Sequence, residues 1–144
     1  MNTISEILKK KGTEVWSVTP GTKVIEVLRL MAEKNIGAVL VIDNEQLEGI
    51  FSERDYARKV ALEGHSSREL EVGKIMSSKV LYATPEESVE DCMALMIKKR
   101  IRHLPVIENE KLKGLISIGD VVKSLLDENK YTIEQLEHYI TGGR

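Results

Sequence analysis

The chain has 144 residues, with 21 Lys and Arg against 23 Asp and Glu, which gives a formal net charge of −2 at pH 7. This balance argues against a nucleic-acid-binding surface, and the longest continuous apolar run, residues 38–42, is too short to span a membrane. The single cysteine, Cys92, excludes an intrachain disulfide, and the N-terminus lacks the basic flank and apolar core of a secretory signal. We therefore expect one compact cytoplasmic domain.

Two helices are predicted near the N-terminus, with a short extended segment between them. Apolar side chains share one face over residues 4–11, and Gly12 ends this first helix. Residues 14–17 form the extended segment. Apolar residues then recur at the spacing of one helical face over residues 23–34, and Thr22 is the expected N-cap of this second helix.

A β-hairpin and a third helix are predicted next. The β-branched run 38–42 indicates a buried strand, residues 43–46 a tight polar turn, and residues 47–51 the returning strand. Residues 52–62 then favour a helix, which Gly64 ends.

The C-terminal half repeats the same order of elements. Residues 15–60 align with residues 80–125 without a gap, and both copies carry Thr-Pro, Leu-Met and Asn-Glu steps in register. A helix is therefore predicted from residue 89, a second hairpin over residues 103–116, and a closing helix over residues 117–127.

The segments outside the repeats are also expected to be ordered. The polar linker carries four apolar residues and should pack against the domain; these are Leu70, Val72, Ile75 and Met76. Residues 131–140 have apolar residues on one side and predict a final helix. The chain thus divides into an N-terminal helix, a first repeat, a packed linker, a second repeat, and a C-terminal helix with a tail, at residues 1–14, 15–63, 64–79, 80–127 and 128–144. Each repeat has the order β-α-β-β-α, so the predicted fold class is α/β (α+β). Two repeats that bury each other's apolar surface should leave a cleft between them.

The pattern Gly-x-x-Ser-x-x-Asp occurs in each repeat where a predicted strand meets a helix, at Gly49, Ser52 and Asp55 and at Gly114, Ser117 and Asp120. The first backbone N–H groups of a helix have no partner within the helix and carry partial positive charge, which suits an anion such as phosphate. A short carboxylate can accept two hydrogen bonds, and the vicinal hydroxyls of a ribose can donate two. The pattern therefore indicates a nucleotide site, with Arg54 in the same first turn.

The same pattern has a purely structural interpretation. Ser-x-x-Asp at the start of a helix is close to a capping box, in which the two side chains satisfy backbone donors and bind nothing else. Both roles can coexist at one motif, so the sequence leaves the two interpretations open.

Arg102 and His103 make the two repeats chemically unequal. They stand at a predicted helix-to-strand junction, where the first repeat has Gly37 and Ala38. Other chemistry is sparse. Cys92 lies on an apolar helix stripe and is expected in the core, and the three histidines show no metal-ligand spacing. We see no Walker-type phosphate loop and no Ser/His/Asp order, so no catalytic residue is assigned.

The tandem copies resemble a pair of cystathionine-β-synthase-type (CBS) domains, and in particular the stand-alone bacterial CBS-pair proteins. The resemblance rests on the Thr-Pro steps, the segment 101–106 and the doubled Gly-x-x-Ser-x-x-Asp, and it covers residues 15–125. It implies two repeats packed with pseudo-twofold symmetry, a homodimer of such pairs, and an adenosine-containing ligand such as AMP, ATP, NAD(H) or S-adenosylmethionine in clefts between the repeats.

Carried over to this chain, the resemblance implies that Asp55 and Asp120 bind the ribose hydroxyls. Ser52 and Ser117, with Arg54, would then face the phosphate. Each cleft would be completed by the other repeat: the Asp55 cleft by Thr84, Val89, Ile101, Arg102 and His103, and the Asp120 cleft by Thr19, Val24, Ile36, Gly37 and Ala38. Gly119 departs from the polar residue often found at its position, so we rank the Asp55 cleft first for a phosphorylated ligand.

The function expected from these features is regulatory: a module that senses an adenosine nucleotide and passes the resulting shift to a partner or across a dimer. Such a module needs no cofactor besides its regulatory ligand, and we expect no nucleic-acid or membrane partner. The alternative is a ligand-free protein–protein interaction module, in which the motifs are caps only. An enzyme is the least supported reading, because the chain has no room for a catalytic barrel and shows no activated nucleophile.

Overall fold

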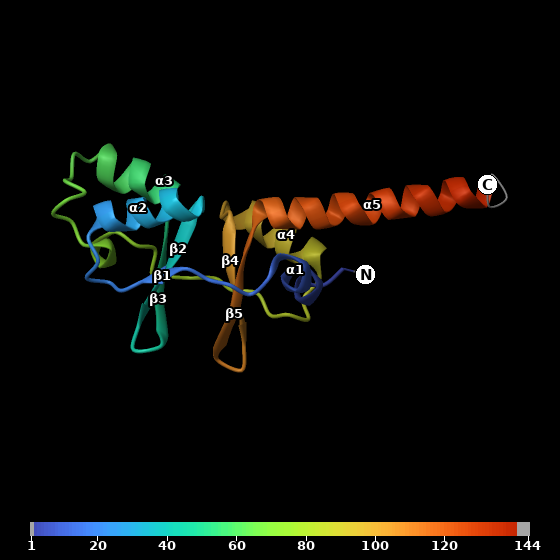
Figure 1. Cartoon of the computed structure of the whole chain (residues 1–144), viewed down its shortest axis with the longest axis horizontal. Coiled ribbons are helices and arrows are strands. Elements are labelled where there is room, and N and C mark those ends of the chain that lie inside the picture. The colour runs from blue at the N-terminus through green and yellow to red at the C-terminus, as the bar shows by residue number, and fades with distance from the viewer. Residues whose placement is uncertain (1, 141–144) are drawn as a thin grey trace. The chain divides into compact units, whose positions relative to one another are not determined.

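The computed structural model describes residues 2–140 and groups the chain into two compact units. One unit is Val15–Val80, and the other combines Met1–Glu14 with Leu81–Arg144. Both units combine helices with a small β-sheet (Figure 1), so the predicted α/β (α+β) class is confirmed. The pseudo-twofold packing of the two repeats stays a prediction.

The unit Val15–Val80 contains a three-stranded sheet in the order β1 (Ser17–Val18), β2 (Ala38–Asp43), β3 (Gln46–Ser52). β1 is parallel to β2, and β2 is antiparallel to β3. The hairpin turns at Asn44 and Glu45, which both have positive φ (49° and 66°). A two-residue turn whose twist matches that of the strands requires positive φ at both of its central residues.

Helices cover this sheet and close the core of the unit. α2 (Val24–Lys34) and α3 (Glu53–Asp55) lie next to each other in Figure 1, and α3 continues into a π-helix, Tyr56–Ala61. The buried core joins residues of α2, the hairpin and the π-helix to the linker, namely Val24, Val27, Met31, Val39, Val41, Phe51, Val60 and Val72. Val72 belongs to a short 3-10 helix, Val72–Lys74, and is fully buried, so this part of the linker packs into the core of the unit.

The other unit repeats this plan with a shorter sheet. α4 (Val89–Lys99) precedes the antiparallel hairpin of β4 (His103–Glu108) and β5 (Lys111–Ser117), which turns at Asn109 and Glu110 with φ of 52° and 65°. The counterpart of β1 is reduced to a single parallel bridge between Ala83 and Val106. α5 (Ile118–Ile140) extends past α1 (Ile4–Lys11) and α4 of its own unit in Figure 1.

Each unit contains a segment that precedes the other repeat in the sequence. α1 precedes the first repeat, yet Ile4, Ile7 and Leu8 are buried in the core of the second. The glycines of the two motifs pack closely against these segments. A Cβ at Gly114 would lie 2.7 Å from Leu8 Cδ2, whereas a Cβ at Gly49 would lie 2.6 Å from Sδ of the linker's Met76. The glycine of the pattern is therefore needed for close packing in both units.

Two expectations about helices were wrong. Thr22 is not the N-cap of α2, because Lys23 takes that position without a side-chain bond. The first-turn donors are satisfied from the linker instead: Val24 N donates to Leu70 O and Ile25 N to Ser67 O, both at 2.9 Å. The two helices predicted over residues 117–127 and 131–140 form one continuous helix, α5, since the intervening residues include neither Gly nor Pro.

Candidate functional site

The first motif is a capping box at the junction of β3 and α3. Asp55 N donates to Ser52 Oγ at 3.2 Å, and Ser52 N donates to Asp55 Oδ2 at 2.9 Å. The Ser52 hydroxyl also lies 3.1 Å from Asp55 Oδ2. These reciprocal bonds fix the direction of the carboxylate, because it is held by the backbone of the strand that leads into the helix. The structural interpretation of the pattern is therefore confirmed here.

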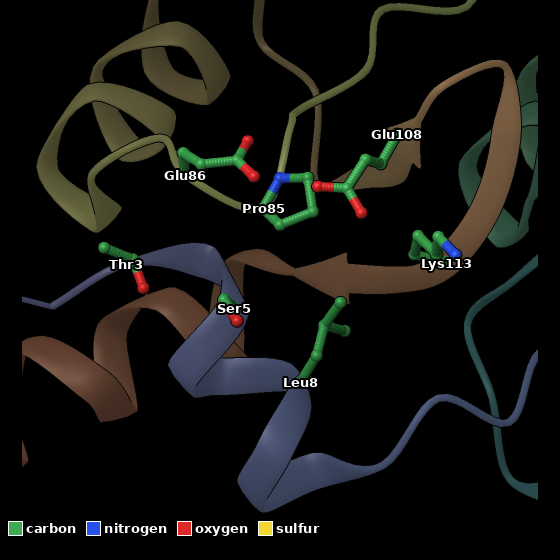
Figure 2. A pocket seen from close by; sticks show the side chains of 7 residues that line it. All are labelled: Thr3, Ser5, Leu8, Pro85, Glu86, Glu108 and Lys113. Carbon is green, nitrogen blue, oxygen red and sulfur yellow. The ribbon is translucent and has the colours of Figure 1, made fainter.

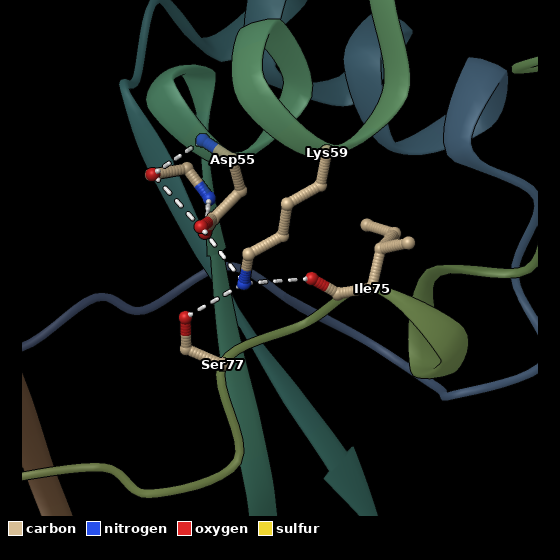
Figure 3. A network of polar contacts seen from close by, with 5 residues as sticks. Asp55, Lys59, Ile75 and Ser77 are labelled. Carbon is tan, nitrogen blue, oxygen red and sulfur yellow. Dashed lines mark hydrogen bonds and ion pairs between the residues drawn. The ribbon is translucent and has the colours of Figure 1, made fainter. Parts of the chain in front are cut away.

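Lys59 ties this carboxylate to the linker (Figure 3). Its Nζ lies 3.3 Å from Asp55 Oδ1 and donates to Ile75 O at 3.2 Å and to Ser77 Oγ at 3.3 Å. The Asp55 side chain keeps only 16% of its surface exposed. Sequence analysis missed Lys59, although its position four residues after Asp55 was a signal that the two side chains could meet. Arg54, expected to face a phosphate, is exposed.

The second motif repeats the cap at the junction of β5 and α5. Ser117 N donates to Asp120 Oδ2 at 2.8 Å, and Asp120 N donates to Ser117 Oγ at 3.1 Å. A lysine again approaches the carboxylate, but it comes from α1. Lys11 Nζ lies 2.6 Å from Asp120 Oδ2 and 2.7 Å from Leu115 O. No sequence spacing could have indicated this pair, because the two residues meet only through the packing of α1.

The charges around the second motif shift two pKa values. Burial alone would raise the pKa of Asp120, but hydrogen bonds from Lys11 and Ser117 outweigh burial and lower it. The pKa of His103 is lowered, first by burial and then by the positive charges of Lys11 and Arg102, with the charge of Asp120 acting in the opposite direction. Near neutral pH this arrangement favours an anionic Asp120 beside an uncharged His103.

The backbone brings Arg102 and His103 to the second motif within their own unit. Ile118 N donates to Arg102 O at 2.8 Å, and His103 pairs with Ser117 across the hairpin. Gly37 and Ala38 hold the same places beside the first motif, where Glu53 N donates to Gly37 O at 3.1 Å and Ala38 pairs with Ser52. That each pair also completes the cleft of the other repeat stays a prediction.

The remaining predicted ligand residues differ in what they expose. Val24 and Val89 have no exposed surface, so neither side chain is open to a ligand in this structure. Ile36 and Ile101 pack as partly buried residues against the two cores. The hydroxyls of the Thr-Pro threonines are already engaged. Thr19 Oγ1 pairs with Thr22 Oγ1 at 3.1 Å, and Thr84 Oγ1 donates to Glu87 Oε1 at 3.4 Å.

Two hollows lie in the unit that contains the second repeat. The larger, of about 450 Å³, contains none of the predicted ligand residues and is lined by Thr3, Ser5, Leu8, Pro85, Glu86, Glu108 and Lys113 (Figure 2). A hydrogen bond with Glu86 and the nearby charge of that group raise the pKa of Glu108. The smaller hollow, of about 200 Å³, lies along α1 and α5, and both Lys11 and Asp120 line it.

Two features are absent from residues 2–140. No helix in that range is long and apolar enough to cross a membrane. No three His, Cys, Asp or Glu side chains in it are grouped so that they could hold a metal ion.

Comparison with known proteins identifies similar chains. The model of the CBS domain matches residues 4–62 and 72–127. The mitochondrial CBS domain-containing protein CBSX3 of Arabidopsis thaliana is 39% identical over 151 residues, which cover 98% of this chain and 73% of the relative. The CBS domain-containing protein YhcV of Bacillus subtilis is 30% identical over 118 residues, or 82% of this chain and 84% of the relative.

Solved structures show the same fold. A CBS-domain protein from Burkholderia ambifaria MC40-6, described as a candidate signal-transduction protein, superposes with a TM-score of 0.85 at 49% identity, over 88% of this chain and 95% of its own. The CBS domain pair of protein MJ0100, solved in complex with 5′-methylthioadenosine and S-adenosyl-L-methionine, has a TM-score of 0.77 at 19% identity. The match covers 89% of this chain and 98% of that one, and at this identity it speaks for the fold alone.

Proposed function

Because the chain belongs to the CBS-domain family, we propose that it binds an adenosine nucleotide through the aspartates of its two Ser-x-x-Asp motifs. The ligand is AMP, ATP or NAD(H), and binding serves a regulatory or signalling role. The single observation that carries the proposal is the geometry of the Asp55 carboxylate. Its Oδ2 is fixed by Ser52 N at 2.9 Å, at the start of a helix.

A fixed carboxylate beside a helix start combines two functions that a nucleotide needs. It offers hydrogen-bond acceptors in a set direction, which suits the two hydroxyls of a ribose. Arg54, in the first turn of the same helix, is exposed and positively charged, which suits a phosphate. The ligands in the MJ0100 complex both contain adenosine, and the ligands proposed here belong to the same chemical class.

A thermal-shift titration with AMP, ATP and NAD(H) tests the proposal. Ligand at a hundredfold excess over its Kd adds about 2.7 kcal/mol to the free energy of unfolding. For a domain of this size, that corresponds to a rise in Tm of about 5–10 °C. Asp55→Asn should weaken the rise, because it removes the anionic acceptor and leaves the side chain the same shape. Glu53→Gln, which changes an exposed acid in the same turn, is the matched control.

A second candidate function is a ligand-free interaction module. The specific observation in its favour is that both aspartates already serve as caps and already contact a lysine. The same titration separates the two candidates, since an unchanged Tm with all three nucleotides would leave only the second. Assembly as a homodimer and a cytoplasmic location are further parts of the proposal, and light scattering on the purified chain measures the first of them.

A further inference from the structure

The two motif aspartates both contact a lysine, but the lysines come from different elements. Lys59 belongs to the π-helix that follows α3, and its Nζ lies 3.3 Å from Asp55 Oδ1. In the second repeat the position of Lys59 is taken by Ser124, so the local lysine is missing. Lys11 of α1 takes its place, with Nζ 2.6 Å from Asp120 Oδ2. A lysine therefore lies at each carboxylate, but Lys59 belongs to a repeat, whereas Lys11 lies outside both repeats.

The lysine at Asp120 is held more closely than the one at Asp55. Asp120 Oδ2 accepts hydrogen bonds from Ser117 N at 2.8 Å and from Lys11 Nζ at 2.6 Å, and these two bonds use both lone pairs of the oxygen. At Asp55 the lysine lies 3.3 Å away, longer than a typical charge-assisted hydrogen bond. The other donor to Asp55 Oδ2 besides the backbone is the Ser52 hydroxyl, which can rotate away.

Lys11 also has a second anchor. Its Nζ donates to Leu115 O at 2.7 Å, and it is the last residue of a helix whose Ile4, Ile7 and Leu8 are buried in the core. The ion pair is only partly buried, with 38% of the Lys11 side chain and 25% of the Asp120 side chain exposed. A hollow of about 200 Å³ adjoins both side chains, so there is space for a competing group to approach.

We propose that Lys11 is a specificity-determining residue of the second motif: it competes with the ligand's hydroxyls for Asp120. This inference rests on the proposed function and adds the order in which the two motifs bind the ligand. A ribose that donates to both carboxylate oxygens must first displace Lys11 at Asp120, whereas at Asp55 it meets a lysine whose Nζ lies farther from the carboxylate, at 3.3 Å, and is held by Ile75 O and Ser77 Oγ. The chain then binds its ligand in two unequal steps, the first at Asp55. Binding at Asp120 releases the C-terminal end of α1.

Calorimetric titration with AMP in an Asp55→Asn background tests the inference, because Asp120 is then the remaining motif carboxylate. Adding Lys11→Met should raise the affinity for AMP about fivefold, the value of a partly exposed ion pair. Adding Lys9→Met should leave the affinity unchanged, since Lys9 is an exposed lysine of α1 that lines neither hollow. Hydrogen exchange should show faster exchange at the end of α1 when AMP saturates the wild-type chain.

The outcomes separate this inference from the proposed function. If neither the wild-type chain nor any variant binds AMP, ATP or NAD(H), the proposed function fails and the inference fails with it. If the wild-type chain binds AMP and Lys11→Met brings no gain, the inference alone is overturned. A loss of affinity on Lys11→Met also overturns it, because Lys11 would then be a contact to the ligand's phosphate.

Discussion

Gly49→Ala tests how tightly the first motif packs against the linker. The added Cβ would lie 2.6 Å from Met76 Sδ and 2.8 Å from Ser77 O. The methionine side chain can turn aside, but the oxygen cannot. It accepts from Ile50 N at 3.0 Å while Ser77 N donates to Ile50 O at 2.9 Å, so a retreat would break this bridge. Overpacking of this kind costs about 1–3 kcal/mol, and we expect about 2–3 kcal/mol because backbone must move.

Gly114→Ala and Gly21→Ala provide the comparison. At Gly114 the nearest atom is Leu8 Cδ2 at 2.7 Å, the end of a flexible side chain, so the loss should be about 1 kcal/mol. At Gly21 nothing lies within 4 Å, and the substitution should be neutral or stabilise the fold by up to about 1 kcal/mol.

Urea denaturation followed by circular dichroism measures all three free energies of unfolding, and a melting curve should place Tm of Gly49→Ala about 4–11 °C below wild type. The reasoning is refuted if Gly49→Ala unfolds at the same urea concentration as Gly21→Ala, or if Gly114→Ala is the more destabilised variant.

Three further outcomes are expected. Burial, together with the hydrogen bond to Glu87 and the charge of that residue, raises the pKa of Cys92 to about 12. The thiol of the native chain should therefore resist a thiol reagent at pH 8 and react once urea unfolds the chain. A fast reaction of the native chain would contradict the burial of Cys92. The pKa of His103 is lowered below 6.5, so the unfolded chain takes up its proton first and stability should fall as pH drops below about 6.5. This fall should level off below the folded-state pKa and should be smaller in His103→Gln when both are measured by urea denaturation from pH 7.5 to 5. Lys59→Met should speed hydrogen exchange over residues 72–77, because it removes the bonds to Ile75 and Ser77. The loss of stability should be at most about 1 kcal/mol, because the lysine side chain is 40% exposed. Unchanged exchange would show that these bonds do not hold the linker.

Local patterns carried the prediction of the fold. The polar turns that contain the doubled Asn-Glu step predicted both hairpins, and the structure places the positive-φ pair at these residues in each. The apolar stripe predicted the helices that the structure places at Val24–Lys34 and Val89–Lys99, because its spacing depends only on neighbours one turn apart. The capping interpretation of Ser52 and Asp55 succeeded for the same reason, since every atom involved lies within four residues.

Contacts made through tertiary packing were beyond the sequence. Thr22 looked like a cap, but carbonyls of the linker reach the first turn of α2 and make a side-chain cap unnecessary. Lys11 lies 109 residues from Asp120 along the chain, and nothing near it indicates a carboxylate partner. The contribution of each repeat to the other's ligand cleft depends on the same kind of information and stays a prediction.

Each unit contains a segment that precedes the other repeat, and this arrangement decides where the chain can be cut. A chain severed between the repeats near residue 64 would give two fragments, each missing one layer of its core. The first would keep α1, whose apolar face fits the second fragment, and would lose Val72 and Met76, which cover its own sheet. A self-sufficient half would have to be spliced, for instance by joining residues 1–14 to residues 81–140 through a new loop. The two repeats are therefore adjacent in the sequence, but a single cut between them does not give two complete units.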